Sequence, residues 1–172
     1  MTNNRIIDDI DRELLTMLQQ NARMSNTDMA RKVGLAPSAV LERVRKLEER
    51  KLIHGYAARV DPRSVGRGLL AFVSVRTDGR EITSQTARRL AEIPEVQEVH
   101  NVAGDDCYLV KVRVADTEAL GQLLREKVSS LPNVGSTRTT IVLETLKETI
   151  AVPIAMNGRN GAGRKRPRGG KR

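Results

Sequence analysis

The chain has 172 residues, enough for one domain or two small ones, and its 39% hydrophobic content is sufficient for a modest core in each. Its formal net charge at pH 7 is +9, and only three residues are aromatic, which excludes the aromatic platforms that stack single-stranded nucleic acids. The single cysteine, Cys107, excludes an internal disulfide. With only two histidines beside it, the sequence has no zinc-ligand spacing, so we expect no metal and no cofactor.

The apolar residues are distributed as in a cytoplasmic protein. No stretch approaches the roughly 18 apolar residues of a membrane span, and the N-terminal MTNNRIIDDIDRE lacks the apolar core of a secretory signal. We therefore expect a cytoplasmic location and no membrane partner.

The first sixty residues begin with signals for two short helices. Asp8 and Asp11 have the spacing of a capping box, ahead of an apolar set that repeats every three or four residues: Ile10, Leu14, Leu15 and Leu18. Ser25 and Asp28 repeat the cap signal before a second helix, which Gly34 can end in a left-handed conformation. The inward residues of that second helix are expected to be Met29, Ala30 and Val33.

A third helix follows after a short turn. Pro37 fits its first position, and its apolar stripe consists of Val40, Val44 and Leu47. Two short helices joined by a tight, glycine-containing turn predict a helix-turn-helix. The segment HGYAARVDP, residues 54–62, then predicts a β extension, so residues 1–60 are expected to form a winged-type helix-turn-helix domain.

The third helix has a basic flank that can be interpreted in two ways. In a helix-turn-helix the second helix enters the major groove of double-stranded DNA with its N-terminal residues facing base edges. Here the base-facing residues would be Ser38, Ala39, Glu42 and Arg43, and the phosphate-facing residues Arg45, Lys46 and Arg50. The alternative is a solvated amphipathic helix with ion pairs of Glu42 with Lys46 and of Arg45 with Glu49. The helix alone favours this alternative, whereas the whole three-helix unit favours DNA binding.

Residues 69–150 predict a second domain, after a linker over residues 61–68. Strands are expected at LLAFVSVRT, VQEVHNV, CYLVKVRV and GSTRTTIVLET. Helices are expected at ITSQTARRLAEI, which starts at Ile82, and after a cap at Asp116 or Thr117. The order β-α-β-β-α-β is that of a ferredoxin-like split unit, so the fold class is α+β.

Two separate stretches carry a resemblance to a known family. The run DDIDRELLTMLQQNARMSNTDMARKVGLAPSAVLERVRKLEERKLIHGYAARVDPRSVG resembles the N-terminal domain of the Lrp/AsnC (feast/famine) transcription regulators. The similarity continues through VAGDDCYLVKVRV and LPNVGSTRTTIVLETLKET. It implies a sequence-specific regulator that binds double-stranded DNA, is associated with the nucleoid and is not an enzyme. One departure is Ala36, which stands where family members usually have a serine that caps the recognition helix.

The expected sheet suggests an oligomer. If both helices cover one face, the other face is bare, and we expect the apolar strand residues to lie on both faces: Val73, Val75, Val110, Val112 and Val142. A second chain could cover such a face. The resemblance implies the same, namely a homodimer made by the C-terminal domains and assembled further into tetramers or octamers. A dimer would present two recognition helices to a roughly palindromic site.

The stretch AGDDCY also has two interpretations. Glycine and aspartate are the usual residues of a hairpin turn, and composition alone favours that turn. The resemblance implies instead that an amino-acid effector binds between dimers, at this loop and the neighbouring STRTT strand. The candidate residues are Gly104, Asp105, Asp106, Tyr108, Thr137 and Thr139. Cys107 stands where family members often have a second acid, and a thiol cannot neutralise an ammonium group as a carboxylate does.

Residues 151–172 are expected to be a disordered basic tail. Seven basic residues and no acid lie from residue 159 onward, in a glycine-rich sequence with almost nothing to bury. The tail either attracts phosphates non-specifically or acts as a solubilising end. The glycines of GRNGAG follow no complete βαβ unit, and a pairing of His100 with Cys107 as base and nucleophile is weaker than a structural role for each.

Two alternative functions come from other classes. One is a nucleoid-type architectural protein that binds DNA with little sequence preference. The other is a small-molecule-binding regulatory subunit of an enzyme. A ratio of specific to non-specific affinity at stated salt distinguishes the first from a regulator, and loss of DNA binding with ligand binding retained would indicate the second.

Overall fold

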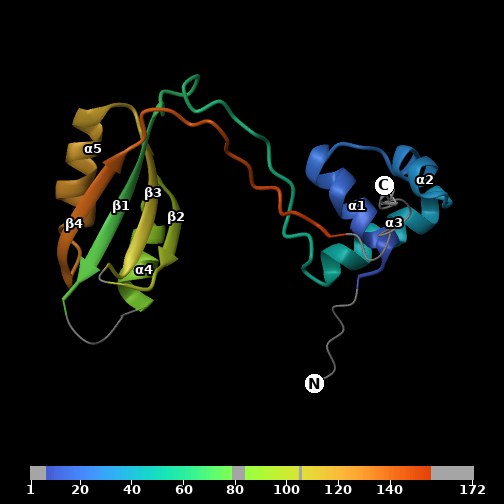
Figure 1. Cartoon of the computed structure of the whole chain (residues 1–172), viewed down its shortest axis with the longest axis horizontal. Helices are drawn as coiled ribbons and strands as arrows, with labels where there is room; N and C mark the ends of the chain where they lie inside the picture. Colours follow the sequence, from blue (N-terminus) through green and yellow to red (C-terminus); the bar gives the residue numbers. More distant parts are fainter. Residues whose placement is uncertain (1–6, 79–83, 105, 156–172) are drawn as a thin grey trace, which may run out of the picture. The chain divides into compact units, whose positions relative to one another are not determined.

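Three short helices and a four-stranded sheet form two separate units in the computed structural model of the chain (Figure 1). The structure describes residues 7–78, 84–104 and 106–155. One unit comprises Met1–Ala58 together with Thr149–Arg172, and the other comprises Arg59–Glu148. The C-terminal end of the described chain therefore belongs with the helices and not with the sheet.

The three helices begin and end where local signals place them. Helix α1 (Asp9–Gln20) is capped by Asp8, whose carboxylate accepts the Asp11 backbone N–H at 2.7 Å. Helix α2 (Asn26–Val33) is capped by Ser25, whose hydroxyl accepts the Asp28 N–H at 3.1 Å. Gly34 ends α2 with a φ of 70°, a left-handed conformation that favours glycine. Helix α3 (Pro37–Glu49) follows after Leu35 and Ala36.

These helices share one hydrophobic core. It is formed by the fully or nearly buried side chains Leu14, Met17, Met29, Ala30, Val40 and Val44, with Ile10, Leu18, Met24, Val33, Leu35 and Ile53 packed around them. The helix-turn-helix expected from the sequence is thus confirmed, and its second helix is α3.

The β extension expected after α3 is not formed. Residues 54–61 contain no strand, because no other strand of this unit's described residues lies alongside to complete a ladder. Tyr56 instead turns back toward α3, where its hydroxyl donates a hydrogen bond to Glu48 at 2.8 Å. Partial burial, together with the Glu48 carboxylate, raises the pKa of Tyr56 to about 12.

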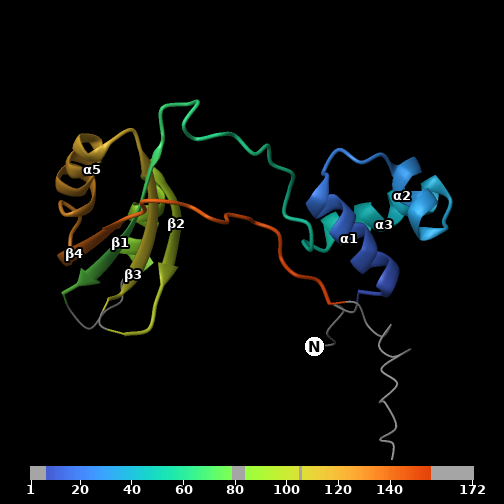
Figure 2. The ribbon, with the colours of Figure 1, turned by 45° about the horizontal axis from the view of Figure 1, so that its top comes forward.

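The second unit has the expected β-α-β-β-α-β order. Its strands are β1 (Leu69–Thr77), β2 (Val96–Asn101), β3 (Tyr108–Val114) and β4 (Val134–Ile141). Its helices are α4 (Ser84–Ala91) and α5 (Thr117–Leu123), and α5 continues into a π-helical turn, η1 (Leu124–Val128). The strands are ordered β2-β3-β1-β4 and every pair is antiparallel (Figure 2). The start expected for α4 at Ile82 lies outside the described residues.

The apolar strand residues gather on one face of the sheet, not on both. Val73 lies opposite Val110, and Val75 and Val112 follow at two-residue steps, so all four point to the same side. That side packs against the helices through Leu90, Ile93, Leu120, Leu123 and Val128. The prediction that valines occupy both faces was wrong for these four. The valines of β1 and β3 would point to opposite faces only if the pairing of the two strands were shifted by one residue.

The opposite face is mixed in character and partly covered by the chain itself. Its central strand residues include Phe72, Leu109 and Lys111, which are half-buried. Lys111 and Arg113 form ion pairs with Glu148, which follows β4, and Lys111 also pairs with Glu98 at 3.0 Å. The hydrogen bond from Lys111 and the nearby Arg113 hold the pKa of Glu148 below its usual range.

Candidate functional site

Helix α3 presents the side chains that the sequence assigned to a nucleic-acid interface. Val40, Val44 and Leu47 are buried, and this fixes the opposite face of the helix toward solvent. Ser38, Ala39 and Glu42 are exposed on the first two turns, and Arg45, Lys46 and Arg50 are exposed farther along. The N-cap residue Ala36 makes no side-chain cap hydrogen bond, so the first turn lacks a contribution of about 1 kcal/mol that a serine would supply.

Both ion pairs of the solvated-helix interpretation are present. Arg45 Nε lies 2.9 Å from Glu49 Oε1, and Lys46 Nζ lies 3.3 Å from Glu42 Oε1. All four side chains remain more than half exposed, so each pair contributes only about 0.3–0.5 kcal/mol and is readily exchanged for another partner. These pairs stabilise the helix without preventing Arg45 and Lys46 from meeting phosphates.

Arg43 lies differently from the other cationic residues of α3. Its Nη1 donates to Asp8 Oδ2 at 2.7 Å and to Asp11 Oδ1 at 2.8 Å, which ties α3 to the first turn of α1. Although partial burial of Asp8 opposes its ionisation, the Asp11 N–H and Arg43 hold the pKa of Asp8 below its ordinary value. A base-facing role for Arg43 would require both ion pairs to open.

Two exposed features of the helical unit had no part in the sequence interpretation. Leu41 is 56% exposed on the solvent face of α3. Its exposure could have been predicted from the sequence, because Leu41 lies outside the apolar stripe that contains Val40. A pocket at the turn between α1 and α2 has a volume of about 480 Å³ and contains Arg23, Arg31 and Lys32. Basic side chains beside the first helix of such a motif suit phosphate contacts, because this helix crosses the DNA backbone.

The loop before β3 has the geometry of a tight connection. Gly104 has a φ of 121°, which side chains with a Cβ rarely adopt, so glycine is required by the backbone there. The Cys107 N–H donates to Val75 O at 3.0 Å, and this bond continues the ladder between β3 and β1. Asp105, one of the predicted effector residues, lies outside the described residues.

Asp106 and Cys107 each have a partner from another strand. Arg138 of β4 donates to Asp106 Oδ2 at 2.9 Å. The Thr77 hydroxyl donates to Cys107 Sγ at 3.1 Å, and this bond, together with one from the Thr77 backbone, lowers the pKa of Cys107. The structure therefore joins the loop to the STRTT strand through Arg138, a residue that sequence reasoning had not singled out.

The remaining predicted effector residues lie on the helix-covered face. Val75 stands between Tyr108 and Thr137 in one row of the sheet, and Thr139 lies opposite Val73 in the next row. Tyr108 is buried, and the two threonines are half-buried at the edge strand. These side chains and the Asp106 carboxylate are thus in neighbouring strands.

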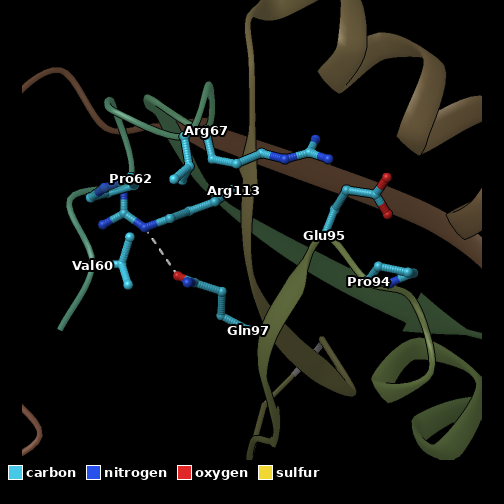
Figure 3. Close-up of a pocket in the computed structure, with 8 residues that line it drawn as sticks. Val60, Pro62, Arg67, Pro94, Glu95, Gln97 and Arg113 are labelled. Carbon is cyan, nitrogen blue, oxygen red and sulfur yellow. Dashed lines mark hydrogen bonds between the residues drawn. The ribbon is translucent and has the colours of Figure 1, made fainter. Parts of the chain in front are cut away.

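A separate pocket of about 190 Å³ lies beside the segment that precedes β1 (Figure 3). Its lining contains none of the predicted effector residues and consists of Val60, Pro62, Val65, Arg67, Pro94, Glu95, Gln97 and Arg113. Arg113 Nε donates to Gln97 across this pocket at 3.1 Å, as the dashed line in Figure 3 shows.

Within the described ranges, no three His, Cys, Asp or Glu side chains gather as a potential metal site. No helix in the same ranges is long and apolar enough to cross a membrane.

Family comparisons match both units of the chain. A model described as the AsnC-type helix-turn-helix domain matches residues 7–48, and one described as the Lrp/AsnC ligand binding domain matches residues 70–152. The leucine-responsive regulatory protein of Escherichia coli K12 is 39% identical over 145 residues, which cover 83% of this chain and 88% of that protein.

Solved structures agree with these matches. A feast or famine regulatory protein from Mycobacterium tuberculosis, complexed with L-methionine, has a TM-score of 0.81 at 38% identity and covers 87% of this chain and 100% of its own. A transcriptional regulator from Neisseria meningitidis in complex with L-methionine has a TM-score of 0.81 at 29% identity, covering 86% of this chain and 97% of its own. The AsnC protein of E. coli has a TM-score of 0.80 at 26% identity and covers 86% and 99%.

Proposed function

Because the chain belongs to the Lrp/AsnC family of transcriptional regulators, we propose that it is a sequence-specific DNA-binding regulator that responds to an amino acid. The observation that carries the proposal is the exposed outer face of α3, the second helix of a helix-turn-helix whose inner face is fixed by the core. A location in the cytoplasm, at the nucleoid, is part of the same proposal.

In this function α3 lies in the major groove. Ser38, Ala39 and Glu42 occupy the N-terminal turns that approach base edges, and a glutamate there can accept a hydrogen bond from cytosine N4. The exposed Leu41 offers apolar contact to a thymine methyl group. Arg45, Lys46 and Arg50 then meet phosphates, which position the helix but carry no sequence information.

The test compares affinities at one salt concentration. Sites enriched from a random duplex pool are compared with scrambled duplexes of the same length and composition. A regulator is expected to prefer its sites by at least about 1,000-fold, the lower end for specific DNA-binding proteins. A ratio near one would favour an architectural DNA-binding protein instead. The seven basic residues after residue 158 are also compatible with that function, because they attract phosphates without regard to sequence.

The effector is proposed to be an amino acid, as in the two relatives that were solved with L-methionine. Its ammonium group would pair with Asp106 or Asp105, and the threonine hydroxyls of β4 would accept or donate to its carboxylate. The proposed site residues remain Gly104, Asp105, Asp106, Tyr108, Thr137 and Thr139. The Arg138 guanidinium already forms an ion pair with the Asp106 carboxylate. The ammonium group of a bound amino acid therefore has to displace Arg138 from Asp106, or the carboxylate of the amino acid has to pair with Arg138.

Calorimetry with each of the twenty amino acids, beginning with methionine and leucine, tests this part of the proposal. Arg138→Gln removes the cation that competes for Asp106 and separates its two possible roles. Tighter binding indicates a competitor, and weaker binding indicates a carboxylate partner. If none of the twenty amino acids binds to the wild-type chain or to Arg138→Gln, the loop has only the structural role of a hairpin.

We also propose a homodimer that assembles to a tetramer or octamer. Large apolar side chains of the sheet unit are exposed after β4, with Leu143 at 97% and Leu146 at 88%. Exposed leucines so close together are costly in a monomer, and a second copy of the chain can bury them. Sedimentation of the full chain at micromolar concentration tests this, with Leu143→Asp expected to weaken assembly and Lys147→Asp serving as the exposed control.

A further inference from the structure

The end of the described chain binds along the outer side of α1. Gln19 forms two hydrogen bonds with one residue: its Oε1 accepts the Val152 N–H at 2.6 Å, and its Nε2 donates to Val152 O at 3.0 Å. Arg12 Nη1 donates to Ala155 O at 2.8 Å. Ile154, between these attachment points, is half-buried. Figures 1 and 2 both show the red end of the ribbon next to α1.

The spacing of these contacts fits an extended segment on a helix. Gln19 and Arg12 are seven residues apart, which is about 10 Å along α1. Val152 and Ala155 are three residues apart, which is also about 10 Å in an extended chain. The pairs run in opposite senses, so the segment proceeds from the C-terminal end of α1 toward its N-terminal end.

That end of α1 is joined to the recognition helix. Asp8 and Asp11, within one turn of Arg12, are the partners of Arg43 in α3. Ala155 is thus held beside the part of α1 that contacts α3. Arg159 follows four residues later, and a chain of four residues spans at most about 14 Å.

The sequence after Ala155 has one chemical character. Residues 159–172 contain seven basic side chains and no acid: Arg159, Arg164, Lys165, Arg166, Arg168, Lys171 and Arg172. Neutralising phosphates with such residues releases counterions, and seven contacts would steepen the salt dependence of DNA binding by as much as about 6 units per chain. The ligand that suits this segment is therefore a polyanion, and DNA is the polyanion that α3 would already hold.

We propose that residues 149–155 form a C-terminal anchor on α1 that delivers residues 159–172 to the same DNA duplex that α3 binds. This inference rests on the proposed DNA-binding function. The anchor shortens the path between the basic residues and α3, and so raises their effective concentration at the duplex. The segment after β4 thereby becomes part of the DNA-binding unit, beyond the family match that ends at residue 152.

The anchor itself is tested without DNA. In the full chain, hydrogen exchange at the Val152 amide is expected to be slowed, and Gln19→Ala should restore fast exchange because the acceptor is removed. Gln20→Ala alters an exposed neighbouring glutamine and serves as the control, with exchange as in the wild type. Fast exchange already in the wild-type chain would overturn the anchor.

The role of the anchor is tested by a cycle of DNA affinities. Gln19→Ala and Gln20→Ala are each measured in the full chain and in a chain ending at residue 156, on one 40-base-pair duplex at 50 mM and 200 mM salt. We expect truncation to weaken binding at 50 mM salt by about 10-fold or more. We expect Gln19→Ala to weaken it by about 5-fold only when the tail is present.

Val152→Pro removes the donor N–H without changing charge and should reproduce Gln19→Ala. Equal effects of Gln19→Ala with and without the tail, or no effect in either chain, would overturn the inference. No DNA binding by the wild-type chain would overturn the proposed function as well. DNA binding without this coupling overturns the inference alone.

Discussion

Arg43 is the residue of α3 for which the structure makes the sharpest prediction. Its guanidinium spans two carboxylates of α1, at 2.7 Å to Asp8 and 2.8 Å to Asp11. Asp11 is only 8% exposed, so Arg43→Ala leaves a nearly buried carboxylate with its charge-assisted partner removed. Removing the partner of a buried polar group lowers the free energy of unfolding by about 1–3 kcal/mol. Because Arg43 is partly exposed, we expect a loss in the lower part of this range, about 1–2 kcal/mol.

The assay is unfolding of the protein without DNA. In a domain of about 60 residues, a loss of 1 kcal/mol lowers the melting temperature by about 4–8 °C, so Arg43→Ala should melt roughly 5–15 °C below the wild type, followed by circular dichroism of the helices. Arg45→Ala is the matched control, because it removes an arginine of the same helix that has only an exposed pair with Glu49. Its expected effect is below about 0.5 kcal/mol.

A result of the opposite kind would refute the reasoning. If Arg43→Ala melted like Arg45→Ala and instead lost discrimination at one base pair of the bound site, Arg43 would be a base-contacting residue whose ion pairs open on DNA. In that case Arg43→Ala would weaken specific DNA binding by about 1–3 kcal/mol, the usual cost of losing one bidentate base contact.

Three further predictions concern single groups. The pKa of Asp8 is lower in the folded protein than in the unfolded chain, where it is near 4. The ionised carboxylate therefore stabilises the fold fully above that unfolded pKa, and this contribution is lost as the pH falls through the lower pKa of the folded state. The urea midpoint of Asp8→Asn should consequently change less than that of the wild type between pH 5 and pH 2. An equal change in both chains would show that Asp8 makes no such contribution. Lys46→Ala should weaken binding to all duplexes alike and reduce the salt slope by about one unit, and a change confined to specific sites would contradict a phosphate contact. Cys107→Asp should raise calorimetric affinity for an amino acid if the ammonium group lies near the loop, and unchanged affinity would place it elsewhere.

The local structure of the helical unit could be predicted because its signals are local. Asp8, Ser25 and Gly34 act on groups within four residues of themselves, and all three do so as expected. The missing cap at Ala36 followed from the same reasoning. The order of strands and helices in the second unit could likewise be predicted, because apolar strand-like runs alternate there with segments whose apolar residues repeat at helical spacing.

The contacts that were not predicted join residues far apart in the sequence. Arg43 meets Asp8 across 35 residues, and Gln19 meets Val152 across 133. No periodicity or capping rule connects such positions, because they depend on how packed elements present their exposed sides. Residues 151–155, expected to be part of a disordered tail, therefore belong to the described helical unit.

The face assignment failed for a different reason. The bounds of the strands that carry Val73 and Val110 were predicted to within one residue, but the register that places these two valines opposite each other was not. A shift of one residue in that register moves a side chain to the other face of a sheet. The β extension after α3 failed because a strand needs a neighbour, and the sequence of one segment does not show whether its neighbour exists.

Sequence-specific DNA binding by α3 can be measured through the base preference of variants of its exposed face. Sites would be selected from random duplexes with the wild-type chain, with Glu42→Gln, and with Glu49→Gln as a control near the end of the same helix. We expect Glu42→Gln to change the preferred base at one or two positions of each half-site and Glu49→Gln to leave the motif unchanged. Identical motifs from all three chains, or no motif from the wild type, would show that α3 does not read the DNA sequence.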